Sequence, residues 1–364
     1  MRSIKYVLLL GVICIVSLGI YVGQVLSFDK TKFVVETKKG DPNEEVVQNM
    51  QLRLGEWGQN PNEYVLSTDG NMTKSSQTIL SLLFYDESNW TDAPRSFQQF
   101  AWRNNTHVFT KDSITYGINR LNENKLELQY WNAQTNKLAT LRVKLPEDQM
   151  NKQLRFSPFQ RTGDKLLIDA TPLNRQIERE YIYQIDLKKK SMIKIKLPDR
   201  LGKEDTIRSL YNGKMIVDQV KELEYPDDFL NETVVKDGRK TKVLKEFDGV
   251  YESSVINDGK YYLGLLEISV NPSSKKKVKW VIYDVESERL ITKTIDLKTP
   301  TSDKDFSHTS FTINHDHIYF AYRTKKNEVK SLVINPLTSE VIYEANVQKQ
   351  GSKNDIILNE VTTN

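Results

Sequence analysis

Acidic residues recur at one structural position along this chain, and they are the first feature that could carry out chemistry. Asp86, Asp186, Asp237 and Asp284 each stand at the entrance of a polar turn. Glycosidic hydrolysis needs two carboxyl groups close together, and a fold that gathered these acids in one channel would supply them. Aspartate at a turn entrance also caps backbone amides, and the position favours this role. With 48 acidic residues in the chain, the sequence does not single out a catalytic pair.

Two histidines form the nearest approach to a metal-ligand cluster. His315 and His317 flank Asp316, and residues i and i+2 of a strand share a face, so both imidazoles are able to reach one ion. The same residues coincide with an expected tight turn, where polar side chains occur for conformational reasons. We therefore predict no metal site and no cofactor.

The common catalytic motifs do not occur in the sequence. It contains no Gly-x-Ser-x-Gly, no His-Glu-x-x-His, no phosphate-binding glycine loop and no EF-hand spacing. Serine hydrolase, zinc protease and calcium-loop chemistry are therefore not expected. A binding protein is favoured over an enzyme.

Aromatic side chains are the remaining candidates for contact with a ligand. Trp57, Trp90 and Tyr85 lie in or beside polar, loop-like stretches, where they could stack on a sugar or anchor a protein partner. Trp131 and Trp280 stand in alternating strands, so we predict that they pack in the core between structural units.

These residues belong to a chain in which a short sequence motif recurs about every fifty residues. The motif is one residue, most often apolar or aromatic, followed by Asp or Asn, a polar turn and a new strand. It occurs at Tyr85-Asp86, Trp131-Asn132, Ile185-Asp186, Lys236-Asp237, Tyr283-Asp284 and Ile334-Asn335. The intervals between its acidic or amide positions are 46, 54, 51, 47 and 51 residues. A nearly constant period of this size indicates a repeat architecture.

A second signal divides each repeat into strands. Hairpin-turn pairs such as Asn212-Gly213 and Asp258-Gly259 precede short strands rich in β-branched and aromatic residues. Each repeat then contains four antiparallel strands, which predicts an all-β fold, a β-propeller of about six four-stranded blades. Five or seven blades, or tandem β-sandwich domains, are the alternatives.

The predicted domains divide the chain into five parts. Residues 1–6 form a cytoplasmic tip, 7–27 a membrane segment, 28–97 an irregular first blade, 98–345 the repeated blades, and 346–364 a closing strand and tail. In the irregular blade we expect strands at Phe33–Thr37, Glu63–Ser67 and Thr78–Tyr85, and a short helix around Glu44–Leu54. The C-terminal strand around Asp355–Leu358 is expected to complete this blade.

The N-terminal segment has the length and composition of a membrane anchor. Val7–Ser27 contains 21 residues without a charge, and Arg2 and Lys5 precede it. As a helix it would span about 31 Å, enough for the hydrocarbon core of a bilayer. The preceding basic residues favour a cytoplasmic N-terminus and an extracellular body. Cleavage as a secretory signal is the alternative.

The charge balance limits the classes of possible partner, and the cysteine content limits the disulfides that the chain can form. Without Arg2 and Lys5, 50 basic residues face 48 acidic ones, a balance that argues against nucleic acid as the main partner. The runs Lys188–Lys190 and Lys275–Lys277 fall at expected hairpin turns and are interpreted as solvated. Cys14 is the only cysteine, so the body contains no internal disulfide.

Residues 98–345 resemble the propeller superfold, although neither the WD dipeptide nor the kelch glycine pair recurs. With its apolar N-terminal segment, the chain is similar to membrane-anchored propeller-like proteins of bacterial envelopes. That resemblance implies a place in the cell membrane of a Gram-positive type of bacterium. The expected function is a binding or assembly platform for an envelope or membrane protein. A glycan-acting hydrolase using channel carboxylates and a sensor that regulates a signalling protein are the alternatives.

Overall fold

The structure is a computed structural model of the whole chain. It describes residues 16–17, 19, 32–56, 63–75, 93–102, 106–111, 114–146, 154–172, 179–202, 205–222, 229–238, 240–250, 252–269, 277–297, 309–314, 316–324, 327–350 and 356–363. All structural statements below refer to these residues.

Six antiparallel sheets account for the described strands, and each sheet is numbered here as a blade in chain order, with its strands given from the innermost to the outermost. Blade 1 contains β25 (Ile356–Thr363), β2 (Met50–Glu56), β3 (Glu63–Ser67) and β4 (Met72–Ser75). Blade 2 contains β5 (His107–Lys111), β6 (Ile114–Asn122), β7 (Lys125–Asn132) and β8 (Lys137–Lys144). Blade 3 contains β9 (Leu154–Thr162), β10 (Lys165–Pro172), β11 (Arg179–Asp186) and β12 (Ser191–Leu201). Blade 4 contains β13 (Thr206–Tyr211), β14 (Lys214–Glu222), β15 (Phe229–Asp237) and β16 (Lys240–Val243). Blade 5 contains β17 (Glu252–Ile256), β18 (Tyr261–Ser269), β19 (Lys277–Asp284) and β20 (Arg289–Asp296). Blade 6 contains β21 (Thr309–Asn314), β22 (His317–Arg323), β23 (Val329–Ile334), β24 (Val341–Gln350) and β1 (Lys32–Lys39). The helical elements are α2 (Glu45–Gln48), α4 (Arg95–Ala101) and the 3-10 turns η3 (Lys245–Phe247) and η4 (Asn257–Gly259).

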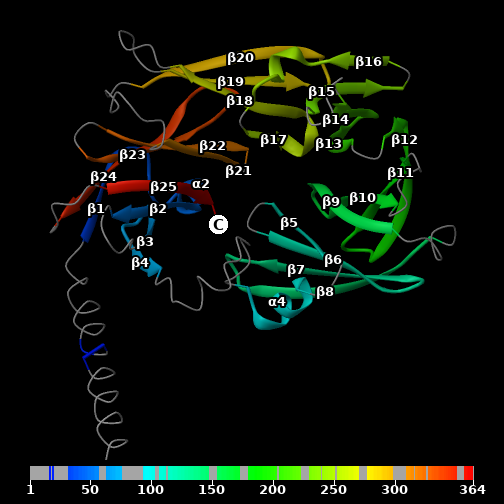
Figure 1. The fold of residues 1–364 in the computed structure, drawn as a ribbon, viewed down its shortest axis with the longest axis horizontal. Helices are drawn as coiled ribbons and strands as arrows, with labels where there is room; N and C mark the ends of the chain where they lie inside the picture. Colours follow the sequence, from blue (N-terminus) through cyan, green and yellow to red (C-terminus); the bar gives the residue numbers. More distant parts are fainter. Residues whose placement is uncertain are drawn as a thin grey trace, which may run out of the picture.

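The six blades surround one axis, as in a β-propeller (Figure 1). The predicted all-β fold with about six blades is confirmed at this level. Blade 6 differs from the prediction because it has five strands. The sheets follow each other around a ring and do not form two stacked sandwiches (Figure 1).

The ring is closed by the first and the last of the described strands, β1 and β25. β25 pairs with β2, with Gln51 opposite Thr362, so the C-terminal strand completes blade 1 as predicted. β1 pairs with β24, with Val34 opposite Gln348. The assignment of the strand at Phe33–Thr37 to the first blade is therefore wrong, because this strand extends blade 6. The way the ring closes determines which strands pair when they are far apart in the sequence. No local sequence pattern encodes this pairing.

The helix expected around Glu44–Leu54 is mostly a strand. Only Glu45–Gln48 is helical, and β2 begins at Met50. Met50, Leu52 and Leu54 are buried, whereas the residues between them are partly exposed. This is the period of two that a strand requires, and pairing with β3 and β25 on both sides overrides the weak helical signal. The strand expected at Thr78–Tyr85 lies outside the described residues.

Apolar side chains fill five of the six junctions between neighbouring blades. Separate buried clusters join blades 2 and 3, 3 and 4, 4 and 5, 5 and 6, and 6 and 1. A sixth cluster packs α4 onto blade 2 through Phe97 and Ala101. Between blades 1 and 2 the described residues make a polar contact, in which Gln134 Nε2 donates to Asn49 Oδ1 at 2.8 Å.

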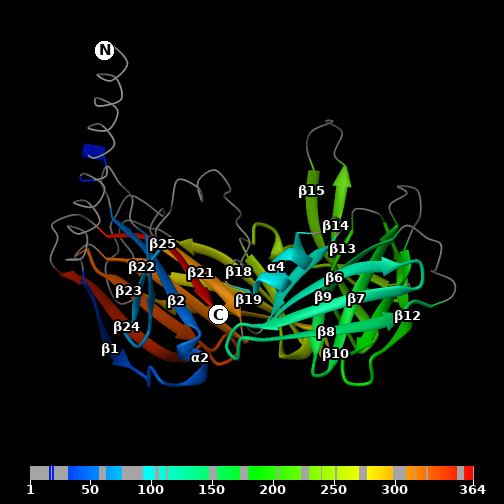
Figure 2. The same ribbon diagram turned by 90° about the horizontal axis from the view of Figure 1, so that it is seen from below.

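The predicted hairpin turns set the register within the blades. Tyr211 pairs with Lys214 across the turn Asn212-Gly213, where φ is 48° and 79°. Positive φ at both central positions defines the type I′ turn that Asn-Gly favours. In the same blade, β14 and β15 continue as a long hairpin that stands above the other strands (Figure 2).

Most of the predicted anchor at Val7–Ser27 lies outside the described residues. Within the part of the chain that the structure describes, no helix has both the length and the apolar character needed to cross a bilayer.

Candidate functional site

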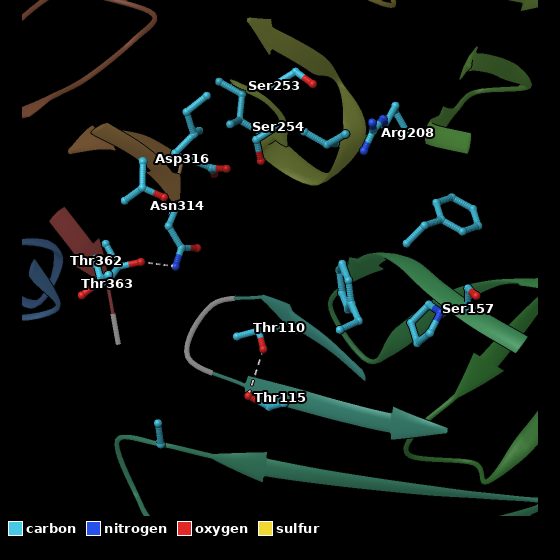
Figure 3. A pocket seen from close by; sticks show the side chains of 18 of the residues that line it. Thr110, Thr115, Ser157, Arg208, Ser253, Ser254, Asn314, Asp316, Thr362 and Thr363 are labelled. Carbon is cyan, nitrogen blue, oxygen red and sulfur yellow. Dashed lines mark hydrogen bonds between the residues drawn. The ribbon is translucent and has the colours of Figure 1, made fainter. Parts of the chain in front are cut away.

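A cavity of about 1230 Å³ lies where the innermost strands of the six blades meet. Side chains from β25, β5, β9, β13, β17 and β21 all line it. In Figure 3 the labelled side chains come from different blades and surround a common space. The site is therefore a product of ring closure, because no single blade forms more than one part of its wall.

The wall of this central cavity is rich in hydroxyl groups. The serine and threonine residues that line it are Thr73, Thr110, Thr115, Ser157, Thr171, Thr206, Ser253, Ser254, Thr312, Thr362 and Thr363. Some already bond to each other: the hydroxyls of Thr110 and Thr115 lie 3.1 Å apart, and Asn314 Nδ2 donates to Thr363 Oγ1 at 2.6 Å (Figure 3). A hydroxyl both donates and accepts hydrogen bonds. The wall can thus satisfy polar groups of either kind on a ligand.

A charged pair connects the cavity to the interior of blade 4. Arg208 Nε donates to Asp218 Oδ2 at 2.6 Å, and Thr233 Oγ1 donates to the other carboxylate oxygen at 2.8 Å. Burial alone would lower the pKa of the Arg208 guanidinium, but the charge of Asp218 and its hydrogen bond to Arg208 together outweigh burial and raise the pKa. Arg208 therefore presents a permanent positive charge to the cavity.

Tyr262 extends this network from blade 4 to blade 5. Its hydroxyl donates to Ser253 Oγ at 2.8 Å, and both residues line the cavity. Burial, with a contribution from the negative charge of Asp218, raises the pKa of Tyr262 to about 12. The phenol stays neutral at physiological pH and acts as a fixed hydrogen-bond donor.

The other described carboxylates of the cavity are largely held by the ring itself. Asp205 Oδ2 accepts the backbone N–H of Gly202 at 2.9 Å, and Asp316 Oδ1 accepts that of Asn257 at 2.8 Å. Glu360 lies 3.8 Å from Arg53 Nε across the β2–β25 pair. These acids stabilise turns and strand pairs, which leaves hydroxyl groups, backbone groups and the positive charge of Arg208 to meet a ligand.

Glu252 has a different environment at the start of β17. Its Oε1 accepts the backbone N–H of Ile313 at 3.1 Å and the hydroxyl of Thr312 at 3.4 Å, both on β21. Burial raises the pKa of Glu252, and the negative charge of Glu360 adds to the effect, although the two hydrogen bonds oppose it. A carboxyl group whose pKa is raised by burial and by a neighbouring carboxylate is a feature of acid–base catalysts.

Side chains of one innermost strand cap the backbone of the next. Gln160 Oε1 on β9 accepts the N–H of Leu210 on β13 at 2.9 Å, and Ser310 Oγ on β21 accepts the N–H of Val361 on β25 at 2.9 Å. Glu252 makes the equivalent bond from β17 to β21. Innermost strands have one edge without a partner strand, so these bonds satisfy donors that would otherwise be buried alone.

The aromatic residues predicted to bind a ligand are not placed by the structure. Trp57, Tyr85 and Trp90, together with His315, lie outside the described residues. His317 is partly buried at the start of β22. Among the described residues no three His, Cys, Asp or Glu side chains gather as metal ligands would.

The two tryptophans expected in the core are buried, but in different ways. Trp280 lies between blades 5 and 6, with no exposed surface, and its Nε1 donates to the carbonyl of Pro336 at 2.9 Å. Trp131 packs beneath α4 in blade 2 and also reaches the central cavity. The expectation that Trp131 fills a junction between blades is wrong, because α4, which the sequence did not reveal, covers it.

The recurrent acids are caps wherever they are described with partners. Asp186 Oδ1 accepts the N–H of Lys189 at 2.7 Å, and Asp284 Oδ1 accepts those of Glu286 and Ser287 at 3.0 and 3.2 Å. Burial acts against ionisation of Asp284, but a hydrogen bond from the Ser287 hydroxyl and these two backbone bonds outweigh burial and lower its pKa. The predicted capping role is confirmed for these two residues. Asp86 lies outside the described residues.

Comparison with known proteins gives no relative by sequence. No family model matches the chain, and no curated protein matches it. Similar solved structures include the WD40 domain of SCAP from fission yeast, at 8% identity and a TM-score of 0.29, covering 91% of this chain and 75% of that one. They also include a Synechocystis ACO mutant, at 9% identity and a TM-score of 0.40, covering 93% and 96%. The propeller domain of the Trilobed protease from Pyrococcus furiosus matches at 10% identity and a TM-score of 0.31, covering 85% and 84%. Likenesses at this level carry no statement about activity.

Proposed function

We propose that this protein is a membrane-tethered, extracytoplasmic platform that binds an envelope or membrane protein at its central cavity. The observation that carries the proposal is the cavity wall, to which all six blades contribute and which is rich in hydroxyl groups. Loops and edges of a rigid propeller suit recognition because the strands hold them in fixed positions. The uncharged segment Val7–Ser27 supplies the tether.

The chemistry of the wall defines the kind of partner. Most described carboxylates at the cavity are engaged in structural bonds, whereas Ser253, Ser254 and Thr362 present small hydroxyls. Phe109 and Phe159 add apolar surface beside them. A polar polypeptide segment, whose backbone offers both donors and acceptors, matches such a wall better than a strongly charged ligand does.

Site-directed photocrosslinking in intact cells tests this function. A photoreactive amino acid replaces Ser254, inside the cavity, in the full-length protein, and the matched control carries it at Thr292, exposed on the outermost strand β20. We expect one discrete crosslinked protein from position 254 that is missing from position 292. The same products from both positions, or none from position 254, would argue against the platform.

A glycan-acting hydrolase is the second candidate, and one observation favours it. Burial and the negative charge of Glu360 raise the pKa of Glu252, and a raised pKa is a property of the carboxyl group that serves as the acid in glycosidic cleavage. The test is a screen of the purified protein against wall polymers and small glycosides. Activity that disappears in both Glu252→Gln and Glu360→Gln, but persists in the exposed control Glu36→Gln, would establish the enzyme.

A further inference from the structure

Charge is distributed unequally between the inside and the outside of the ring. The outermost strands of blades 2 to 6, which are β8, β12, β16, β20 and β1, hold twelve basic residues and two acidic ones, counting the described side chains. The six innermost strands hold three basic and two acidic residues on the same count. The near balance of the whole chain, with 52 basic and 48 acidic residues, conceals this segregation.

The basic residues are accessible and belong to successive blades. Lys144 on β8, Lys196 on β12 and Lys240 on β16 are all exposed. The exposed run Lys188–Lys190 forms the turn that leads into β12. We refer to the basic side chains of the outermost strands of blades 2 to 6 as the basic rim; these strands lie at the periphery of the ring (Figure 1).

Protection of sheet edges explains only part of this pattern. An outermost strand exposes unpaired backbone groups, and charged side chains there prevent pairing with other chains. Lysine is the charged residue most often used for such protection, but edge protection acts on each strand separately. An excess of twelve basic over two acidic residues that continues through five successive blades also creates a positive potential, which attracts anions.

We propose that the basic rim binds a flexible, linear polymer of phosphate groups. A flat anionic membrane would touch only one sector of the circumference, and stiff duplex DNA, with a persistence length of about 50 nm, could not follow the curve. A flexible polyanion is able to pass from blade to blade and meet basic groups on each. This inference is independent of the central cavity and of the function proposed for it.

The test measures binding of long-chain inorganic polyphosphate to the full-length protein in neutral detergent, as a function of salt. The rim variant combines Lys144→Gln, Lys196→Gln and Lys240→Gln. The control variant removes the same charge from exposed lysines on strands that are not outermost, with Lys125→Gln, Lys165→Gln and Lys279→Gln. A third variant, with Arg at the three rim positions, keeps the charge, and circular dichroism verifies that all variants fold.

Binding by the rim gives a specific set of results. At roughly 0.7 per phosphate contact of a flexible chain, loss of three contacts lowers the slope of log Kd against log salt by about 2. The control and arginine variants should keep the wild-type slope. No binding of polyphosphate at low salt, or equal losses in the rim and control variants, would overturn the proposal. Tighter binding of duplex DNA or of anionic vesicles than of polyphosphate would overturn it in favour of those partners.

Discussion

Replacement of Gln160 by leucine should weaken the ring at the place where three blades meet. Gln160 in blade 3 is 2% exposed, and its side chain makes bonds to residues of blades 4 and 5. Oε1 accepts the N–H of Leu210 at 2.9 Å, while Nε2 donates to the carbonyls of Leu210 at 3.3 Å and Asp258 at 3.1 Å. Leucine has a similar volume but makes none of these bonds, so the variant isolates their contribution.

The expected loss follows from the groups left without a partner. A buried donor or acceptor that loses its partner costs about 1 to 3 kcal/mol. The amide of Leu210 loses its acceptor completely, and each carbonyl loses one donor, so we expect Gln160→Leu to lower the free energy of unfolding by about 3 kcal/mol. Urea titration followed by tryptophan fluorescence measures this change.

The matched control is Gln348→Leu. Gln348 Nε2 donates to Glu328 Oε1 at 2.9 Å, but on the exposed surface, where water replaces the lost partner. This variant should change the free energy of unfolding by less than about 0.5 kcal/mol. Equal effects of the two substitutions would refute the reasoning that inner-strand side chains hold the blades together.

Three further predictions concern the same junctions. Trp280→Ala empties a fully buried site between blades 5 and 6 and should lower the free energy of unfolding by about 3 to 5 kcal/mol, whereas Trp280→Phe should lower it clearly less. Thermal unfolding measures both changes, and similar values for the two variants would contradict a packing role for the Trp280 side chain. Gly259→Ala should lower the free energy of unfolding by about 1 to 3 kcal/mol, because φ is +97° and the new methyl group would meet the Gln160 amide. The control is Gly163→Ala, because Gly163 also has positive φ but has no close neighbour. The folded-state pKa of Glu252 lies above its unfolded value, so its contribution to stability is complete below the unfolded pKa and is lost as pH rises through the folded pKa. Wild type should therefore lose stability relative to Glu252→Gln between acidic and neutral pH, and parallel stability curves for the two proteins would be inconsistent with the raised pKa.

Local chemistry made much of the fold predictable. Asn212-Gly213 requires positive φ and formed the expected hairpin, and Asp186 and Asp284 cap the turns at which their spacing placed them. These features depend on a few neighbouring residues, so a single sequence contains all the information they need. Their regular interval then gave the number of blades.

Features that depend on distant partners were not predictable. β1 joins blade 6 because it pairs with the edge of β24, and no residue near Phe33 in the sequence indicates this pairing. Glu252 is one of many acids in the sequence and becomes distinct only when β21 covers it. The basic rim likewise appears only when the outermost strand of each blade is known.

The most direct test of the account is a disulfide across the closing strand pair. In a Cys14→Ser background, Gln51→Cys and Thr362→Cys place two thiols on directly opposed residues of β2 and β25, whose Cα atoms are about 4.5 to 5.5 Å apart in an antiparallel pair. That distance lies within the range of a disulfide. The control joins Gln51→Cys with Thr292→Cys on β20, in a blade on another part of the ring. We predict an intramolecular disulfide, identified by peptide mapping, in the first pair and none in the second. Failure of the first pair to form, or a bond of equal yield in the control, would contradict a ring closed by its C-terminal strand.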